Sequence, residues 1–380
     1  MKKIMRYTVA FLVALALIML AVNAAWAKDT AQLDYADIAL RVPKENKQMD
    51  LLQRTLPVLQ KSYDSMVSAG KDIDSMTNIL RDLDMAYTNA AKIPDLSQLD
   101  QSLIQVLQGS LRFNQMSLGS INLDSINQQV AQTRIQIEQT QAALINGGQQ
   151  LFVGYHQLQD NISKMRDNRL LLEDGLQLTK VQQTAGLGTA LAVKEAELSL
   201  AELDTAILQM ESQGAIMLNQ LKLIVGWPQG QIIKLGGMPK PNREFFGKID
   251  LSADTKSAQD NSYSLKLKQQ EYKFTSSDDQ KVLIKLNMDA QTEQIALSVS
   301  NQYYKIEEKN STLLLEEQRL AVAEEKIKQS RLQHQVGILT SLALQVEEKN
   351  YTAQQEAVTG AMDALFWEIE NYKAIVAGLN

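Results

Sequence analysis

Residues that could carry catalysis or bind a metal are few in this sequence. It has no cysteine and two histidines, His156 and His334, which lie in opposite halves of the chain. Without cysteine there is neither a thiolate nucleophile nor a disulfide framework. Two isolated histidines do not supply the ligands that a zinc site requires. We therefore expect no metal and no cofactor.

Neighbouring carboxylates are the remaining candidates for acid–base chemistry, because two of them can divide the roles of general acid and general base. They form four doublets: Glu307-Glu308, Glu316-Glu317, Glu324-Glu325 and Glu347-Glu348. On a long helix, such doublets are typical of the solvated face. No nucleophile or phosphate-binding loop accompanies them. The sequence therefore predicts a protein that is not an enzyme.

The start of the chain predicts export. Lys2, Lys3 and Arg6 precede an apolar run over 7–22, and Ala25-Trp26-Ala27 supplies the small residues of a cleavage site. A membrane anchor is the alternative, but the run is short and ends in a peptidase-like site. We expect a signal peptide over 1–27 and a mature chain in the periplasm or cell envelope, with outer-membrane association open.

The charge of the chain argues against one class of partner. The formal net charge is −6, and loss of the three cations at the start would make the mature chain more acidic. Nucleic-acid binding surfaces are basic. We expect no nucleic-acid partner.

Two long intervals of the chain lack proline, the strongest helix breaker. The six prolines lie at positions 43, 57, 94, 228, 239 and 241, which leaves 95–227 and 242–380 free. Between Val193 and Ile224, apolar residues recur at alternating spacings of three and four, the a/d pattern of a coiled coil. Ile306, Leu313 and Leu320 follow a seven-residue spacing. The sequence predicts an all-α protein of long antiparallel coiled-coil hairpins with little or no β-strand.

The two intervals are copies of one pattern. At an offset of 151 residues the segment 181–192 lies over 332–343, which aligns Gly186 with Gly337. A shared glycine suits a helix C-cap, and Thr189 and Thr340 suit the N-caps of the return helices. Such self-similarity indicates two tandem repeats.

We therefore expect three segments after residue 27. The first repeat covers 28–225, with its hairpin tip near 186. A linker covers 226–250 and holds one short strand within 231–235. The second repeat covers 251–380, with its tip near 337. Shorter helices over about 48–84 and 252–274 precede the hairpins.

The tips resemble a known family. They read Ala185-Gly186-Leu187-Gly188-Thr189 and Val336-Gly337-Ile338-Leu339-Thr340, and the segments 33–40 and 221–226 add further similarity. This pattern resembles the outer-membrane efflux protein family, the TolC-like exit ducts. The resemblance implies a homotrimer whose helices enclose a tunnel, and tips that dock onto a membrane-fusion adaptor served by an inner-membrane pump. The implied docking residues are Gly186, Leu187, Thr189, Gly337, Ile338, Thr340 and Ser341.

The chain also departs from the family pattern. Gln182 and Gln333 replace the usual arginine before the glycine, and Ala192 and Ala343 replace the aspartate after it. Of the stretches that could hold membrane-spanning strands, 111–123 and 281–288, only 282–286 is strand-like. We expect a TolC-like helical body without the β-barrel strands. The alternative is a structural coiled-coil spacer of the envelope without a transport duct.

Overall fold

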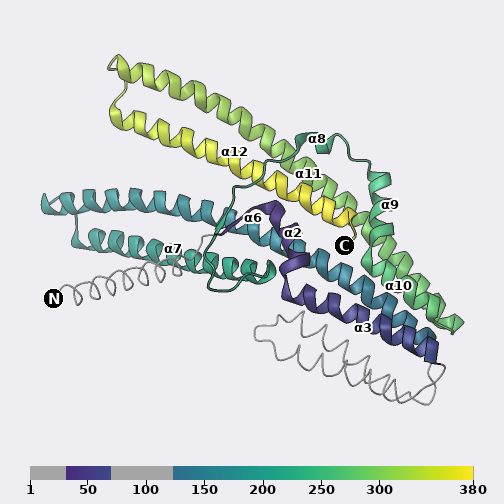
Figure 1. The fold of residues 1–380 in the computed structure, drawn as a ribbon. Helices are drawn as coiled ribbons and strands as arrows, with labels where there is room; N and C mark the ends of the chain where they lie inside the picture. Colours follow the sequence, from purple (N-terminus) through teal and green to yellow (C-terminus); the bar gives the residue numbers. More distant parts are fainter. Residues whose placement is uncertain (1–30, 70–122, 380) are drawn as a thin grey trace, which may run out of the picture.

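The structure, a computed structural model, describes residues 31–69 and 123–379, and these are almost wholly helical. Four helices dominate: α6 (Leu123–Thr184), α7 (Ala190–Ile224), α11 (Asp278–Gln335) and α12 (Ser341–Val376). Each consecutive pair forms a long antiparallel hairpin, α6 with α7 and α11 with α12 (Figure 1). The predicted fold class, two tandem helical hairpins, is confirmed.

Each hairpin is held by the coiled-coil seam that the sequence predicted. On α7, Val193, Ile207 and Leu221 are buried against α6. In the second hairpin, Ile306 and Leu313 of α11 pack with Leu365 and Ile369 of α12. Burial of such side chains stabilises the hairpins by about 1.5–3 kcal/mol each.

Polar residues in the seam of α12 have specific partners. Gln354 donates through Nε2 to Glu316 Oε2 on α11 at 2.7 Å, and Glu368 accepts from Gln302 Nε2 at 2.6 Å. The seam tyrosine Tyr372 donates to Asp254 Oδ2 at 2.8 Å. Buried polar groups require such partners. These contacts therefore favour one alignment of α12 against its neighbours, in addition to stabilising the packing.

Short helices precede each hairpin, and each set consists of two helices that meet at a joint. The joint at Asn46 lies just before the helix expected from about 48, whereas the joint at Ser262 interrupts a helix that the sequence predicted to be continuous. In the first half, α2 (Tyr35–Glu45) and α3 (Lys47–Ala69) meet at Asn46. In the second half, the helix expected over 252–274 is in fact α9 (Leu251–Asn261) and α10 (Tyr263–Phe274), which meet at Ser262. Residues 70–84 of the first predicted helix lie outside the described residues.

A glycine at the end of each return helix explains the two breaks. Gly226, with φ 77°, abuts the backbone at Glu45 and Asn46, and Gly378, with φ 103°, abuts the backbone at Asn261 and Ser262. Side-chain amides complete each joint: Asn46 Nδ2 donates to Ile224 O at 2.8 Å, and Asn261 Nδ2 donates to Val376 O at 3.0 Å. Each short-helix pair is therefore folded around the C-terminal end of its own hairpin.

Two strands are present in the described residues. β1 (Ala31–Leu33) pairs in parallel with β2 (Ile233–Leu235), with Gln32 opposite Lys234. The strand expected within 231–235 is thus confirmed as β2. The stretch 282–286, which looked strand-like, lies inside α11, because Ile284 is buried as part of the helix's apolar face. Residues 111–122 lie outside the described residues.

The two halves meet at an aromatic contact beside α6. Tyr35 of α2 lies edge-on to Phe152 of α6 at 5.8 Å between ring centroids and to Phe366 of α12 at 4.9 Å. Toward their tips the two hairpins then separate (Figure 1). Among the helices of 31–69 and 123–379, none combines the length and apolar character needed to cross a membrane.

Candidate functional site

The tips of the two hairpins are built alike. Gly186 and Gly337 adopt φ values of 76° and 78° directly after the outgoing helices. Leu187 N donates to Gln182 O at 2.8 Å, and Ile338 N donates to Gln333 O at 2.8 Å. These are the hydrogen bonds of a glycine-terminated helix end, so the predicted C-caps are confirmed.

The return helices begin with the predicted threonine caps. Thr189 Oγ1 accepts from Ala192 N at 3.1 Å, and Thr340 Oγ1 accepts from Ala343 N at 3.2 Å. A side-chain cap is worth about 1 kcal/mol to a helix. The connection between the two helices is therefore short at both tips.

Each tip exposes one large apolar side chain. Leu187 is 82% exposed and Ile338 is 76% exposed. Thr189, Thr340 and Ser341 are exposed beside them. The predicted docking residues therefore form two separate surfaces, one at each tip, rather than one combined site. Exposed apolar residues at such positions are available to a partner.

The second tip has a contact that the sequence did not indicate. His334 lies half-buried with Nδ1 2.9 Å from Leu339 O. Because a carbonyl only accepts, Nδ1 carries the hydrogen. The first tip has Gln183 and Gly188 at the corresponding positions. The sequence around a single histidine does not indicate that its side chain will contact a backbone carbonyl five residues later, across the turn.

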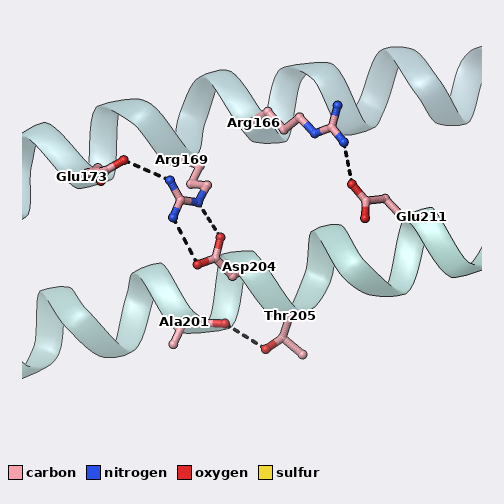
Figure 2. Close-up of polar contacts among 7 residues, drawn as sticks. All are labelled: Arg166, Arg169, Glu173, Ala201, Asp204, Thr205 and Glu211. Carbon is pink, nitrogen blue, oxygen red and sulfur yellow. Dashed lines mark hydrogen bonds and ion pairs between the residues drawn. The ribbon is translucent and has the colours of Figure 1, made fainter.

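Ion pairs join the two arms of the first hairpin on its surface (Figure 2). Arg169 of α6 donates through Nε to Asp204 Oδ1 of α7 at 2.5 Å, and through Nη1 to Glu173 at 2.9 Å. Arg166 reaches Glu211 at 2.6 Å. The hydrogen bond with Asp204 raises the pKa of Arg169. These pairs favour one alignment of α6 against α7.

One acidic doublet of the second hairpin, Glu347-Glu348, serves in the same way. Glu347 pairs with Lys326 at 2.9 Å, and Glu348 with Arg331 at 3.3 Å, so both cross between α11 and α12. Within the described residues, no three His, Asp or Glu side chains gather as metal ligands would. Of the four doublets, Glu347-Glu348 thus supplies ion pairs that favour one alignment of α11 against α12, whereas Glu308, Glu316 and Glu325 pair with cations of their own helix.

We expect Arg169→Gln to lower the thermal midpoint of unfolding in low salt. The loss should shrink in about 1 M NaCl, because salt screens exposed charges. Lys194→Gln removes the same charge from an exposed position of α7 and is the matched control. An equal loss at both salt concentrations would contradict an electrostatic role for Arg169.

Both outward-facing helices carry a second row of apolar side chains, exposed and outside their coiled-coil seam. The outer seam of α7 is exposed and consists of Leu191, Leu198, Leu208, Ile216 and Leu223. The outer seam of α11 is equally exposed and consists of Leu286, Leu297, Tyr304, Leu315 and Val322. Rows of exposed apolar side chains can mark a protein–protein contact.

Comparison with known proteins decides the fold. No protein-family model and no curated protein sequence match the chain. The crystal structure of the outer membrane protein VceC from Vibrio cholerae superposes with a TM-score of 0.50 at 11% identity, over 90% of this chain and 96% of that chain. This chain has the TolC-like fold.

Two further channels align less closely. The outer-membrane channel OprN gives a TM-score of 0.42 at 13% identity, over 86% of this chain and 92% of that chain. CusC gives 0.44 at 11% identity, over 67% and 72%. The resemblance predicted from the tip sequences is confirmed at the level of fold by the VceC match. The apolar side chains exposed at the hairpin tips and along the outer seams have no partner within the described part of the chain.

Proposed function

We propose that this chain forms the helical wall of an export conduit in the cell envelope, closed by contact between three copies. The proposal rests on the exposure of the two outer seams. Within one chain the neighbouring helices run in the order α7, α6, α12, α11. Its two outermost helices are therefore the two that carry exposed apolar seams.

The position of the seams favours a ring. A contact between unlike surfaces, α11 of one copy and α7 of the next, is head-to-tail, and its repetition gives a ring where the rotation between copies closes. Leu208 and Leu315 lie at similar distances from their tips, 19 residues after Thr189 and 21 residues before Val336. Two α-helices with apolar stripes at this spacing can pack as a coiled coil.

The similarity to VceC supports the same proposal. VceC is described as an outer membrane protein, and this chain covers nearly all of its length. We propose an envelope location for this chain, transport of solute as its task, and non-covalent assembly as its mechanism. The signal peptide expected over 1–27 fits that location.

We further propose that the two tips dock onto a membrane-fusion adaptor that is served by an inner-membrane pump. Gly186, Leu187 and Thr189 would make the contact at the first tip. Gly337, Ile338, Thr340 and Ser341 would make it at the second. Two features support this docking. Each tip exposes one aliphatic side chain, and the glycine next to it has no side chain that would obstruct a partner.

The assembly proposal is tested by the solution mass of residues 28–380 without detergent, measured by light scattering during gel filtration. A stable trimer is the expected result. A monomer across micromolar concentrations would contradict ring closure and favour the structural spacer.

Docking is tested with Leu187→Asp and Ile338→Asp together. We expect at least a tenfold loss of binding to the membrane-fusion adaptor of the same cell, because an exposed apolar contact is replaced by a charge. Gly175→Glu is the matched control, since Gly175 is exposed on α6 and away from the tip. Unchanged binding of the double variant, with helicity intact, would remove the docking assignment.

A further inference from the structure

Acidic side chains follow α7 in two rows that have different surroundings. The first, the inner acid row, consists of Glu197, Asp204 and Glu211, which are spaced by seven residues. Each of these carboxylates forms an ion pair with a cation of α6, at 2.9 Å, 2.5 Å and 2.6 Å in that order. The inner acid row therefore holds α7 to the other arm of its own hairpin.

The second, the outer acid row, consists of Glu195 and Glu202, which are also seven residues apart. Both are exposed, and neither side chain has an ion pair or hydrogen bond with a residue of 31–69 or 123–379. They lie one helical turn before and one turn after Leu198 of the outer seam. The outer acid row is therefore part of the edge that α7 presents to a neighbouring chain.

The outer seam of α11 has cations in the same part of the hairpin. The side chains of Arg319 and Lys328 are 58% and 63% exposed. Their partners within the chain are Glu316 and Glu325, each three residues earlier on the same helix. Exposed pairs of this kind contribute little to stability, so both cations are available to a carboxylate of another chain.

The contact proposed between α11 of one copy and α7 of the next brings these charges together. The two helices run in opposite directions, because α7 leads away from its tip and α11 leads toward its tip. When Leu208 lies beside Leu315, Glu195 and Lys328 both lie 13 residues closer to the tips. The other acid and the other cation lie six and four residues closer to the tips, within one helical turn of each other.

We propose that the outer acid row of each copy forms ion pairs with Arg319 and Lys328 of the neighbouring copy, and that these pairs select the unlike edge as the partner. This inference rests on the proposed conduit and names the residues that decide how its copies meet. Charged residues beside a coiled-coil seam set which helices pair and in which direction.

The outer acid row also disfavours a competing assembly. If two copies met through the same edge, α7 against α7, the outer acid rows of both copies would be brought into one contact. Like charges that face each other at an interface weaken binding. A two-fold dimer through α7 is therefore disfavoured, whereas the head-to-tail contact pairs opposite charges.

The solution mass of the full chain without its expected signal peptide, measured by light scattering over a series of concentrations, tests the ion pairs. In the Glu195→Lys, Glu202→Lys double variant, the concentration at which half of the chain is assembled should rise at least tenfold, because attraction becomes repulsion at each contact. The matched control is Asp167→Lys with Asp174→Lys. It reverses two exposed carboxylates of α6, also seven residues apart, and should leave assembly unchanged.

Two further measurements on the double variant identify the cause. Adding Arg319→Glu and Lys328→Glu exchanges the charges across the contact and should restore the trimer. About 1 M NaCl should recover much of the lost assembly, because salt screens the repulsion between exposed charges. The salt measurement needs no further substitution, so it applies even if the fourfold variant folds poorly.

The outcomes separate the ion pairs from the conduit. An unmodified chain that stays monomeric would overturn both. Trimers that form equally well in the unmodified chain and in the double variant would overturn the ion pairs and leave the conduit standing. A double variant whose assembly recovers neither on charge exchange nor in salt would likewise overturn the ion pairs, because its defect would not be electrostatic.

Discussion

Gly226→Ala is expected to lower the free energy of unfolding by roughly 4 kcal/mol, whereas Gly186→Ala should cost about 1 kcal/mol. Both glycines have nearly the same φ, 77° and 76°, so an alanine strains the backbone equally at each. Around Gly186 nothing lies within 4 Å of an added Cβ, but at Gly226 that carbon would overlap the carbonyl group of Glu45.

Chemical denaturation of the four single variants gives the test. Gly378→Ala should behave like Gly226→Ala, because its Cβ would overlap the carbonyl of Asn261. Gly337→Ala should behave like Gly186→Ala, because its surroundings are open. Equal losses at joints and tips would show that φ alone governs the cost and that the joints are not closely packed.

Asp363→Asn should stabilise the chain at high pH relative to the unmodified protein. An acid whose pKa rises from 3.8 to about 6 on folding binds its proton more tightly in the folded state. Its contribution to stability is therefore fully present below pH 3.8 and is lost as the pH rises through 6. A shift of this size corresponds to about 3 kcal/mol.

The measurement is the free energy of unfolding of both proteins from pH 4 to pH 8. The advantage of Asp363→Asn should grow from pH 4 until the pH has passed the pKa of about 6, by up to about 3 kcal/mol in all, and then stay constant up to pH 8. Asp174→Asn, at an exposed position of α6, is the control and should give a curve parallel to that of the unmodified chain. Parallel curves for Asp363→Asn as well would mean that Asp363 is not desolvated in the folded state.

The hairpins could be predicted from sequence because local signals specify them. Prolines are excluded from the long arms, apolar residues follow the a/d spacing, and Gly186 and Gly337 mark the turns. Each of these signals acts over a few residues. The lengths of α6, α7, α11 and α12 agree with them for that reason.

The joint at Ser262 was not predicted, although both joints carry a local signal. Asn46 Oδ1 accepts from Met49 N and Ser262 Oγ accepts from Leu265 N, as helix N-caps do. The glycine that abuts each joint, Gly226 or Gly378, is distant in sequence, so its contact could not be predicted. The same holds for the pairing of Arg169 with Asp204 on the other arm of the hairpin. Sequence periodicity shows which face of a helix is apolar. It does not show which charged residues of two neighbouring helices will lie opposite each other.

The outer seams were present in the sequence but hidden by the inner ones. An α-helix with apolar residues on two opposite faces has little net amphipathicity, so a search for one apolar face finds only the stronger. Leu208, Leu315 and their neighbours became recognisable once the structure showed which seam is buried.

Disulfide cross-linking between the two outer seams tests ring closure most directly. The chain has no cysteine, so Leu208→Cys combined with Leu315→Cys can form disulfides only at the introduced positions. Ser199→Cys, which lies on another exposed face of α7, replaces Leu208→Cys in the control pair. We predict that mild oxidation of the Leu208→Cys, Leu315→Cys variant gives covalent dimers and trimers and nothing larger. Only monomers, or an open-ended ladder of oligomers, would contradict a closed ring of three.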